Sequence, residues 1–273
     1  PVTLATGPPP DPAFVLADQA YAALRSGGRR EAARLFDAAL ILKPDNMGWR
    51  HERDALGRRL QVSAWALLRD SPLPQYNAPG RGLANFTASP VLGGGQMGAS
   101  LALLANPLSS RPLALVARAN VAAGISGIQR DTAQAAIGLR KTLLPGITIS
   151  AERLVAIGAN AGNDWTVRLA AGGRSGRIEA YGEAGVLARG TLYGGGQAQA
   201  RLLRIGPVDI GAGAWGSVQT ERTPGFPPVW RVDAGPAARA AWRGLQLEAQ
   251  WRQRVAGNAS PGSGPVVTVA ARF

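Results

Sequence analysis

From about residue 62 onwards, hydrophobic and polar residues alternate along the chain with a period of two. In 113–123, LALVARANVAA, Leu113, Leu115 and Val121 fall on one face, whereas Arg118 and Asn120 fall on the other. IEAYGEAGVLA and LQLEAQWRQR repeat the pattern. Successive side chains of a β-strand point to opposite faces, so this period is the repeat of a strand. The region is therefore predicted to be β-structure almost throughout.

About twelve such segments are expected, separated by short turns or longer loops. They begin near residues 62, 95, 112, 131, 146, 163, 177, 192, 207, 228, 243 and 264. ANFTASPV, residues 84–91, is either a thirteenth strand or an extension of a neighbouring one. Lengths of about ten to thirteen residues exceed the ~5–6 of a soluble strand. They suit a tilted transmembrane strand of about 9–11 residues.

Alternation alone fits two folds, because a soluble β-sandwich turns its apolar face inward and a membrane barrel turns it outward. Long consecutive strands favour the barrel, and so does an apolar face rich in Ala, Val, Ile, Leu and Gly. Tryptophans near strand ends predict an aromatic girdle: Trp165, Trp230, Trp242 and Trp251. The predicted fold class is mainly β, a transmembrane antiparallel β-barrel of about twelve strands preceded by a small α-helical segment.

Charges of both signs occupy the polar face, which in a barrel lines the lumen. The expected lumen-lining residues are Arg118, Arg140, Glu152, Arg168, Glu179, Glu183, Arg201, Arg231, Arg239, Glu248, Arg252 and Arg254. One interpretation is a wet pore that guides a hydrophilic glycan, since arginine forks suit carboxylated or sulfated sugars. The other is a salt-bridged plug, with the barrel acting only as an anchor. The sequence leaves both open.

The first sixty residues have a different organisation. Residues 1–11 are a Pro-rich linker, 12–60 are predicted helices and 61–273 form the barrel. Helices are expected from 12 to about 26, from 29 to 42 and from 47 to 60, with Asp11 as an N-cap before Pro12. Small, turn, aromatic and proline positions make the first two helices resemble one tetratricopeptide repeat: Ala20, Gly27, Ala32, Phe36, Ala39 and Pro44. One repeat cannot bury its own face, so we expect further repeats before Pro1 in a longer protein. The alternative is a helical hairpin that caps the barrel.

Composition weighs against several classes of function. The net charge of +13 suggests nucleic acid, but the arginines are spread singly along the chain, so nucleic-acid binding is not expected. With no cysteine and with His51 as the one histidine, neither a transition-metal site nor a cofactor is expected. Glu179 and Glu183 share a face but are expected to neutralise arginines rather than to act as a glycosidase pair. GGGQ at 93–96 and 194–197 opens no helix, so it predicts strand curvature rather than a phosphate loop. We therefore do not expect this protein to be an enzyme.

The chain closes on an alternating segment, VVTVAARF at 266–273. A closed barrel must pair its last strand with its first, which explains a strand that runs to Phe273. The terminal aromatic resembles the carboxy-terminal signal of bacterial outer-membrane proteins that the barrel-assembly machinery reads. An even number of strands would put the start of the first strand and the end of the last strand on the periplasmic side.

Several segments resemble the carboxy-terminal domain of the bacteriophage adsorption protein A family: QVSAWALLRD, VLGGGQMGASLAL, AERLVAIGANAGNDWTVRLAAG and YGEAGVLARGTLYGGGQAQARL. The resemblance covers about residues 61–273, and its most specific residues are Glu152, Arg153, Leu154, Ile157, Gly158, Asn163, Asp164, Trp165 and Arg168. It implies a barrel in outer-membrane lipid with periplasmic tetratricopeptide repeats. Such proteins work beside an inner-membrane glycosyltransferase in exporting an exopolysaccharide, and a phage uses their exposed loops as a receptor. The expected location is thus the bacterial outer membrane, with the helical segment in the periplasm.

Overall fold

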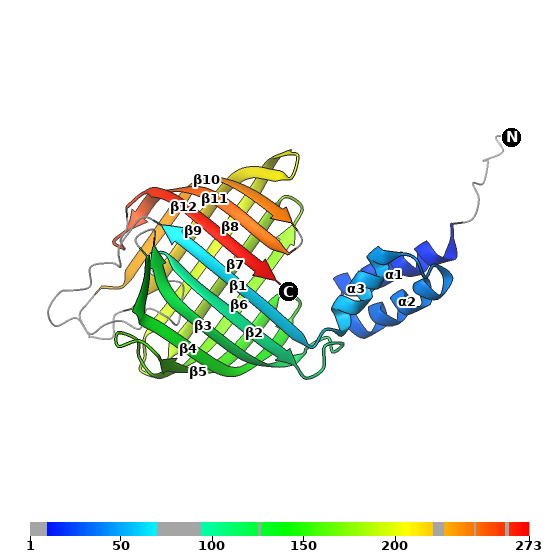
Figure 1. The fold of residues 1–273 in the computed structure, drawn as a ribbon, viewed down its shortest axis with the longest axis horizontal. Helices are drawn as coiled ribbons and strands as arrows, with labels where there is room; N and C mark the ends of the chain where they lie inside the picture. Colours follow the sequence, from blue (N-terminus) through cyan, green and yellow to red (C-terminus); the bar gives the residue numbers. More distant parts are fainter. Residues whose placement is uncertain are drawn as a thin grey trace.

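Three helices precede twelve strands in the described part of a computed structural model of the chain (Figure 1). The structure describes residues 10–69, 94–124, 127–220, 227–242, 244–259 and 262–272. The helices are α1 (Pro12–Arg25), α2 (Arg29–Leu42) and α3 (Met47–Gly57). The strands are β1 (Leu60–Arg69), β2 (Gln96–Leu104), β3 (Leu113–Gly124), β4 (Gly127–Leu144), β5 (Ile147–Ala156), β6 (Asp164–Ser175), β7 (Ile178–Leu187), β8 (Leu192–Ile205), β9 (Val208–Gln219), β10 (Val229–Trp242), β11 (Leu245–Gly257) and β12 (Gly264–Arg272).

The strands form one closed antiparallel barrel. Each strand pairs with the next in sequence, and β12 returns to β1 with a register that runs from Ser63↔Arg272 to Arg69↔Val266. Closure satisfies the backbone groups of both end strands, as a hydrocarbon environment requires. The predicted fold class, an antiparallel barrel of about twelve strands, is therefore confirmed. Residues 84–91, the candidate thirteenth strand, and Phe273 lie outside the described residues.

Most strands begin close to the expected residue, and β4 is the exception because it begins earlier, at Gly127. Its register with β3 shifts between Asn120 and Ala122, which accommodates the polar residues before Ala133. The Thr132 hydroxyl stabilises this bulge, since it accepts a hydrogen bond from the Ala122 amide at 2.9 Å and donates one to the Gln129 carbonyl at 2.8 Å. A bulge adds residues to one strand without ending the pairing.

The helical segment forms around its caps as expected. The Asp11 carboxylate accepts a hydrogen bond from the Ala13 amide at 2.9 Å and begins α1. Its other oxygen lies 2.6 Å from Lys43 Nζ, and this interaction, with the Ala13 amide, lowers the pKa of the Asp11 carboxyl. Gly27, with φ of 82°, allows the tight turn into α2. Helix α3 ends at Gly57, before the predicted residue 60, because the chain already enters β1 at Leu60.

Small side chains let the helices pack closely. The fully buried centre is lined by Ala13, Ala20, Ala32, Phe36 and Ala39. Phe36 meets the ring of Tyr21 edge to face, with the centroids 5.1 Å apart, which is a favourable aromatic geometry. None of the helices in the described residues is long and apolar enough to cross a membrane.

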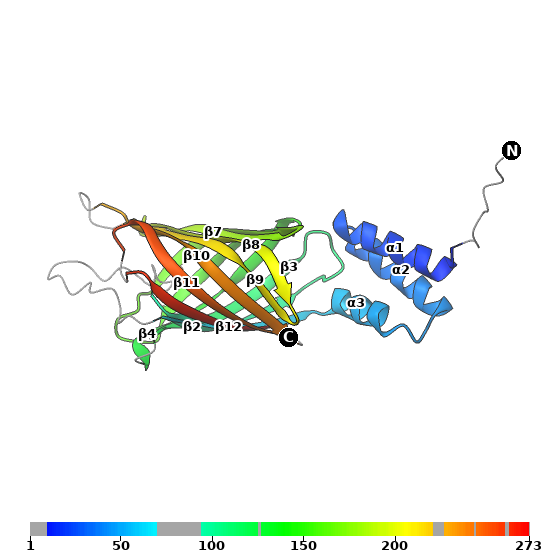
Figure 2. The same cartoon turned by 90° about the horizontal axis from the view of Figure 1, so that it is seen from above.

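The two ends of the barrel differ in their connections. At the end where the helices lie, strands are joined by tight turns such as Pro145–Gly146 and Gly206–Pro207 (Figures 1 and 2). At the opposite end several connections are longer, such as 157–163 between β5 and β6 and 188–191 between β7 and β8, although β3 and β4 are separated only by residues 125–126. We call these the helix end and the loop end. Outer-membrane barrels have short periplasmic turns and longer extracellular loops, and most connections of this barrel follow the same asymmetry.

The helices contact the barrel through the β2–β3 connection, which is the longest one at the helix end. Arg29 Nε donates a hydrogen bond to the Pro107 carbonyl at 2.7 Å. The Leu108 side chain packs against the helical core. Burial lowers the pKa of the Arg29 guanidinium, although not enough to discharge an arginine near neutral pH. The helical segment is thus attached by a side-chain contact as well as by the chain itself.

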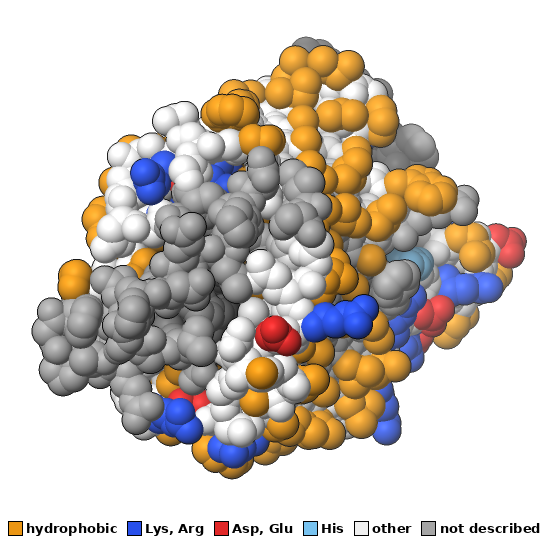
Figure 3. Space-filling model, turned by 60° about the vertical axis from the view of Figure 1, so that its left-hand side comes forward, with side chains coloured by type: hydrophobic (Ala, Val, Ile, Leu, Met, Phe, Trp, Pro, Cys, Tyr) orange, Lys and Arg blue, Asp and Glu red, His pale blue; other side chains and the backbone are white. Residues whose placement is uncertain are grey.

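The outer surface of the barrel is apolar. Ile137, Ile149 and Leu247 point outward and are 51%, 36% and 50% exposed. On the face in view in Figure 3, hydrophobic side chains spread over the barrel wall. The tryptophans predicted to form a girdle are all on this surface: Trp165, Trp230, Trp242 and Trp251. The apolar face of the strands is therefore outside and the polar face inside, which is the arrangement of a transmembrane barrel.

Charge-bearing side chains on the outer face of the strands lie near strand ends. Lys141 is exposed close to the helix end of β4. Arg153 lies toward the loop end of β5, with its guanidinium 5.6 Å from the ring centroid of Trp165. Basic and aromatic side chains are favoured where the hydrocarbon region gives way to water.

Candidate functional site: the lumen

A cavity of about 470 Å³ lies inside the barrel. Nearly every strand contributes to its wall, so it is a property of the closed barrel rather than of one hairpin. Five arginines and two carboxylates line it: Arg118, Arg140, Arg168, Arg231, Arg252, Glu183 and Asp233. The other lining residues include Trp65, Gln96, Ser100, Asn120, Tyr181, Gln197, Trp215, Ser217 and Thr268. The cavity wall has both polar and apolar surface, and its charged side chains carry an excess of positive charge.

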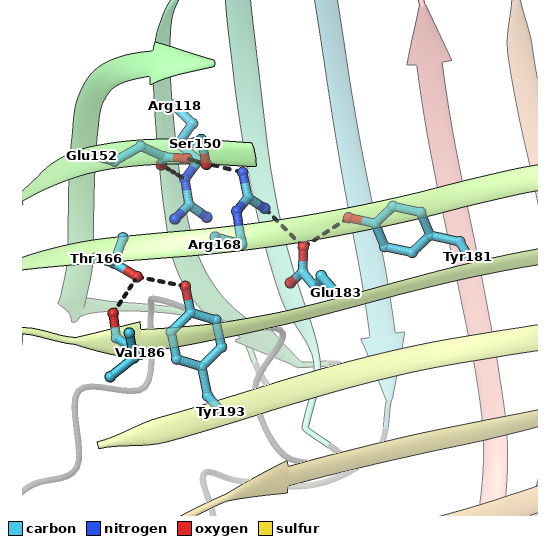
Figure 4. A network of polar contacts seen from close by, with 9 residues as sticks. All are labelled: Arg118, Ser150, Glu152, Thr166, Arg168, Tyr181, Glu183, Val186 and Tyr193. Carbon is cyan, nitrogen blue, oxygen red and sulfur yellow. Dashed lines mark hydrogen bonds and ion pairs between the residues drawn. The ribbon is translucent and has the colours of Figure 1, made fainter. Parts of the chain in front are cut away.

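A chain of ion pairs crosses one wall from β3 to β7 (Figure 4). Glu152 is fully buried, and its two oxygens lie 2.6 Å from Arg118 Nε and 3.1 Å from Arg168 Nη2. The Ser150 hydroxyl also donates a hydrogen bond to Glu152 at 2.6 Å. Arg168 continues to Glu183 at 2.7 Å. Charge-assisted hydrogen bonds of this kind hold planar guanidinium groups in fixed orientations.

Small residues on β4 allow this chain to form. Arg118 on β3 and Glu152 on β5 are separated by β4, where Ala136 and Gly138 are their register partners. A side chain on Gly138 would collide with the backbone of Ala151 and Glu152. Because β4 is nearly bare here, Arg118 reaches across it to the carboxylate.

A second cluster lies toward the helix end. Arg239 on β10 pairs with Glu179 on β7 at 2.7 Å and with Glu248 on β11 at 3.3 Å. Gln199 on β8 accepts a hydrogen bond from Arg239 and donates one to Glu248, each at 2.6 Å. Gln250 donates to Glu248 at 2.6 Å as well. These residues come from strands that are not all neighbours, so their side chains bridge the curved wall and narrow the lumen.

A third cluster lies toward the loop end. Asp233 on β10 is buried and accepts from Arg231 Nη2 at 2.6 Å, and Arg69 Nη1 of β1 lies 3.4 Å from its other oxygen. Next to it, Arg252 donates to Gln250 at 2.6 Å and lies 4.6 Å from the ring centroid of Trp215. An arginine over an indole face is a favourable cation–π geometry.

Two cavity arginines have no ion pair within the described residues. Arg140 Nη2 donates to the side-chain oxygen of Gln61 at 3.2 Å, and Arg252 has its contacts with Gln250 and Trp215. Neither has a carboxylate within 4.0 Å among the residues described. Carboxylates farther away interact electrostatically with these groups, Glu152 with Arg140 and both Asp233 and Glu248 with Arg252, but none occupies their hydrogen-bond donors.

The residues expected to line the lumen lie on the inward face of their strands. Some border the cavity and others belong to the clusters around it, whereas Arg201 and Arg254 lie near the ends of the barrel, where Arg201 is 3.6 Å from Asp209. The structure adds Arg69, Tyr181 and Trp215 to the lumen, which the site prediction omitted. The alternation in LQVSAWALLR, with Val62 and Leu68 outward, could have placed Arg69 inside.

The structure also shows where the carboxylates, the histidine and the glycine-rich segment considered as possible catalytic features lie. Glu179 is paired with Arg239, and Glu183 with Arg168, so both carboxylates neutralise arginines. His51 is exposed on α3. No cluster of potential metal ligands occurs within the described residues. The glycines of GGGQ at 194–197 lie in β8, paired with β7 and β9, and open no helix.

Comparisons with known proteins found no matching protein family and no matching curated protein. The relationship to the bacteriophage adsorption protein A family therefore stays a prediction. Solved structures with a similar fold include an outer membrane channel from Pseudomonas putida F1, with 12% identity over 78% of this chain and 95% of that one and a TM-score of 0.42. The outer membrane protein Omp33 of Acinetobacter baumannii matches with 12% identity over 79% and 97% of the two chains and a TM-score of 0.38. A bacterial polysaccharide outer membrane secretin matches with 9% identity over 78% and 97% and a TM-score of 0.35. All three TM-scores lie below 0.5, so these similarities carry no argument about function.

Proposed function

We propose that this chain is a bacterial outer-membrane barrel whose lumen carries a hydrophilic, anionic polysaccharide out of the cell. The observation that carries the proposal is the cavity wall, where five arginines face only two carboxylates. Arginine is always charged and presents a planar fork of donors that matches carboxylate or sulfate groups. A barrel with an apolar outside and such an inside is suited to passing an acidic exopolysaccharide.

Arginines are distributed along the lumen rather than gathered at one depth. Near the helix end, Arg174 forms an ion pair with Glu179, and Asp209 forms ion pairs with both Arg201 and Arg204. Farther in come the cavity arginines, and Arg254 lies near the loop end. An anionic chain could exchange one guanidinium partner for the next, and binding to several weak sites in sequence favours movement over trapping.

The two ends of the barrel would meet different partners. The helix end faces the periplasm, where the tetratricopeptide-like helices bind an inner-membrane glycosyltransferase or another periplasmic protein, and Phe273 is read by the barrel-assembly machinery. The connections at the loop end face outward, where a phage could use them as a receptor. Crosslinking from the helices to the glycosyltransferase tests the periplasmic role. Comparing phage adsorption to cells with and without the chain tests the receptor role. Absence of both would remove them while leaving the lumen proposal in place.

A second function is favoured by the contacts that bridge the lumen. Arg239 joins β10 to β7, and Arg140 on β4 donates to Gln61 on β1. If these contacts persist, the barrel is a plugged, non-conducting anchor for the helical segment. Buried polar groups that satisfy one another are as consistent with a locked interior as with a wet one.

Conductance in planar bilayers distinguishes the two functions. We expect the full chain to conduct and to prefer anions, because a positive lining concentrates them. Replacing Arg252 by glutamate should lower the anion-to-cation permeability ratio by about twofold or more, since it reverses a charge in the lining. The matched control is Arg153→Glu, which makes the same change on the outer face and should leave the ratio unchanged. An ion-tight barrel would support the anchor, and an equal response of the two variants would contradict the placement of Arg252 in a conducting lumen.

A further inference from the structure

Tyr181 offers an accessible ring to the lumen. It borders the cavity and is 43% exposed, whereas the cavity-lining Trp215 is 5% exposed. On the adjacent strand its register partner is Gly172, which has no side chain to cover the ring. Of the three aromatic rings that border the cavity, Trp215 is buried and Trp65 is partly buried, so only Tyr181 presents an exposed ring.

The position of this ring is fixed from its polar end. The Tyr181 hydroxyl donates a hydrogen bond to Glu183 at 2.7 Å, and Glu183 is held in turn by Arg168 (Figure 4). Arg168 is held by the fully buried Glu152. A ring with a satisfied hydroxyl and an anchored orientation loses little entropy on binding, and its apolar face is what remains for a ligand.

A guanidinium group with spare donors lies in the same cavity. Arg140 on β4 lines the same cavity as Tyr181, and its one described hydrogen bond goes to the neutral Gln61. No carboxylate among the described residues lies within ion-pair distance of it. A planar guanidinium without an ion pair inside the barrel is suited to bidentate binding of a carboxylate.

We propose that Tyr181 and Arg140 form a binding subsite for one acidic sugar unit, with the pyranose ring against Tyr181 and the sugar carboxylate on Arg140. The inference rests on the proposed function and names its substrate class, a uronic-acid-containing glycan. The cavity of about 470 Å³ is of the size that small-molecule sites have. The subsite predicts saturable recognition of acidic sugars rather than mere passage of anions.

Isothermal titration calorimetry on the folded full chain in detergent tests the subsite, with a galacturonic acid trimer as the acidic probe and maltotriose as the neutral one. Arg140→Gln should weaken binding of the acidic trimer by about tenfold or more, because a charge-assisted contact is lost. Tyr181→Ala should weaken it by about three- to tenfold, the scale of an aromatic contact. The parent chain should bind the acidic trimer more tightly than maltotriose. The Arg140→Gln variant should bind the two trisaccharides equally weakly.

Tyr193→Phe is the matched control. Tyr193 lies on the next strand but is buried, and its hydroxyl bonds Thr166 at 2.7 Å, so the acidic trimer should bind this variant as it binds the parent chain. Equal binding of both trisaccharides, or unchanged binding in Arg140→Gln and Tyr181→Ala, would overturn the subsite. Anion-selective conductance without binding of the acidic trimer would remove the subsite and leave the proposed function. Binding to an ion-tight barrel would keep the subsite and remove the export function.

Discussion

Replacing Glu152 by glutamine is expected to destabilise the barrel by about 3 kcal/mol or more. Glu152 is fully buried and is the shared partner of Arg118 and Arg168. Glutamine keeps the volume and removes the charge, so two guanidinium groups are left with less compensation in the barrel wall. Leaving a buried charge uncompensated is among the largest effects that one substitution can have. Urea unfolding of the chain folded into lipid vesicles measures the change in the free energy of unfolding.

The control for this prediction is Glu179→Gln. The Glu179 side chain is 41% exposed near the helix end and pairs with Arg239 at 2.7 Å. Because water screens and solvates this pair, its loss should cost at most about 1 kcal/mol. The double variant Arg118→Gln/Glu152→Gln should regain part of the lost stability, since one uncompensated charge is removed with its partner. Equal costs for the two single variants would show that Glu152 is not the buried centre of the wall.

Replacing Ile137 by arginine is expected to cost about 2–4 kcal/mol in a lipid bilayer. Ile137 lies on the outer face of β4, in the apolar part of the barrel surface, and is 51% exposed. On a soluble protein, a charge at so exposed a position would be nearly neutral. In hydrocarbon the guanidinium must be desolvated or must draw water and headgroups inward, and both are costly. The same unfolding experiment in vesicles gives the difference.

Ile178→Arg is the matched control, because Ile178 is also outward-facing but begins β7 at the helix end. Near the interface an arginine should cost only about 0–1 kcal/mol, since its side chain can reach the headgroups. The depth dependence is therefore the distinguishing result. If Ile137→Arg were as harmless as Ile178→Arg, the outer surface of β4 would not be in contact with hydrocarbon.

The fold could be predicted because it depends on a local pattern. The period of two marked strands such as β3 and β11 and also their polar and apolar faces. Strand length then favoured the membrane over a soluble sandwich. The pattern failed at the start of β4, where Gln129, Asp131 and Thr132 belong to a bulged strand but have the composition of a loop. A bulge depends on pairing with the neighbouring strand, and the alternation of one segment does not contain that information.

The site could be predicted only as a set of inward-facing residues. The alternation of residues along each strand placed Arg118, Glu152 and Arg239 on the inner face. It did not determine which of these charges would pair with one another. Arg239 pairs with Glu179 across two intervening strands, so the contact depends on the curvature of the closed barrel and on strand stagger. Trp215 was missed for a different reason. Tryptophans were associated with the outer girdle, but Trp215 lies inside the barrel. Gly213, which lacks a side chain, leaves room for its ring, and Arg252 lies over the ring.

The most direct test of the account is the accessibility of single spin-labelled cysteines in the folded, membrane-inserted chain. The sequence has no cysteine, so each label reports one position. Labels at Ala151 and Leu169, on the outer face, should be accessible to lipid-soluble oxygen and protected from a water-soluble nickel complex. Labels on the inner face at Thr148, three residues before Ala151, and at Ala170, next to Leu169, should show the opposite preference. Protection of Ala151 and Leu169 from both reagents would indicate a dry protein core behind the apolar face, and would contradict a barrel that turns this face to lipid.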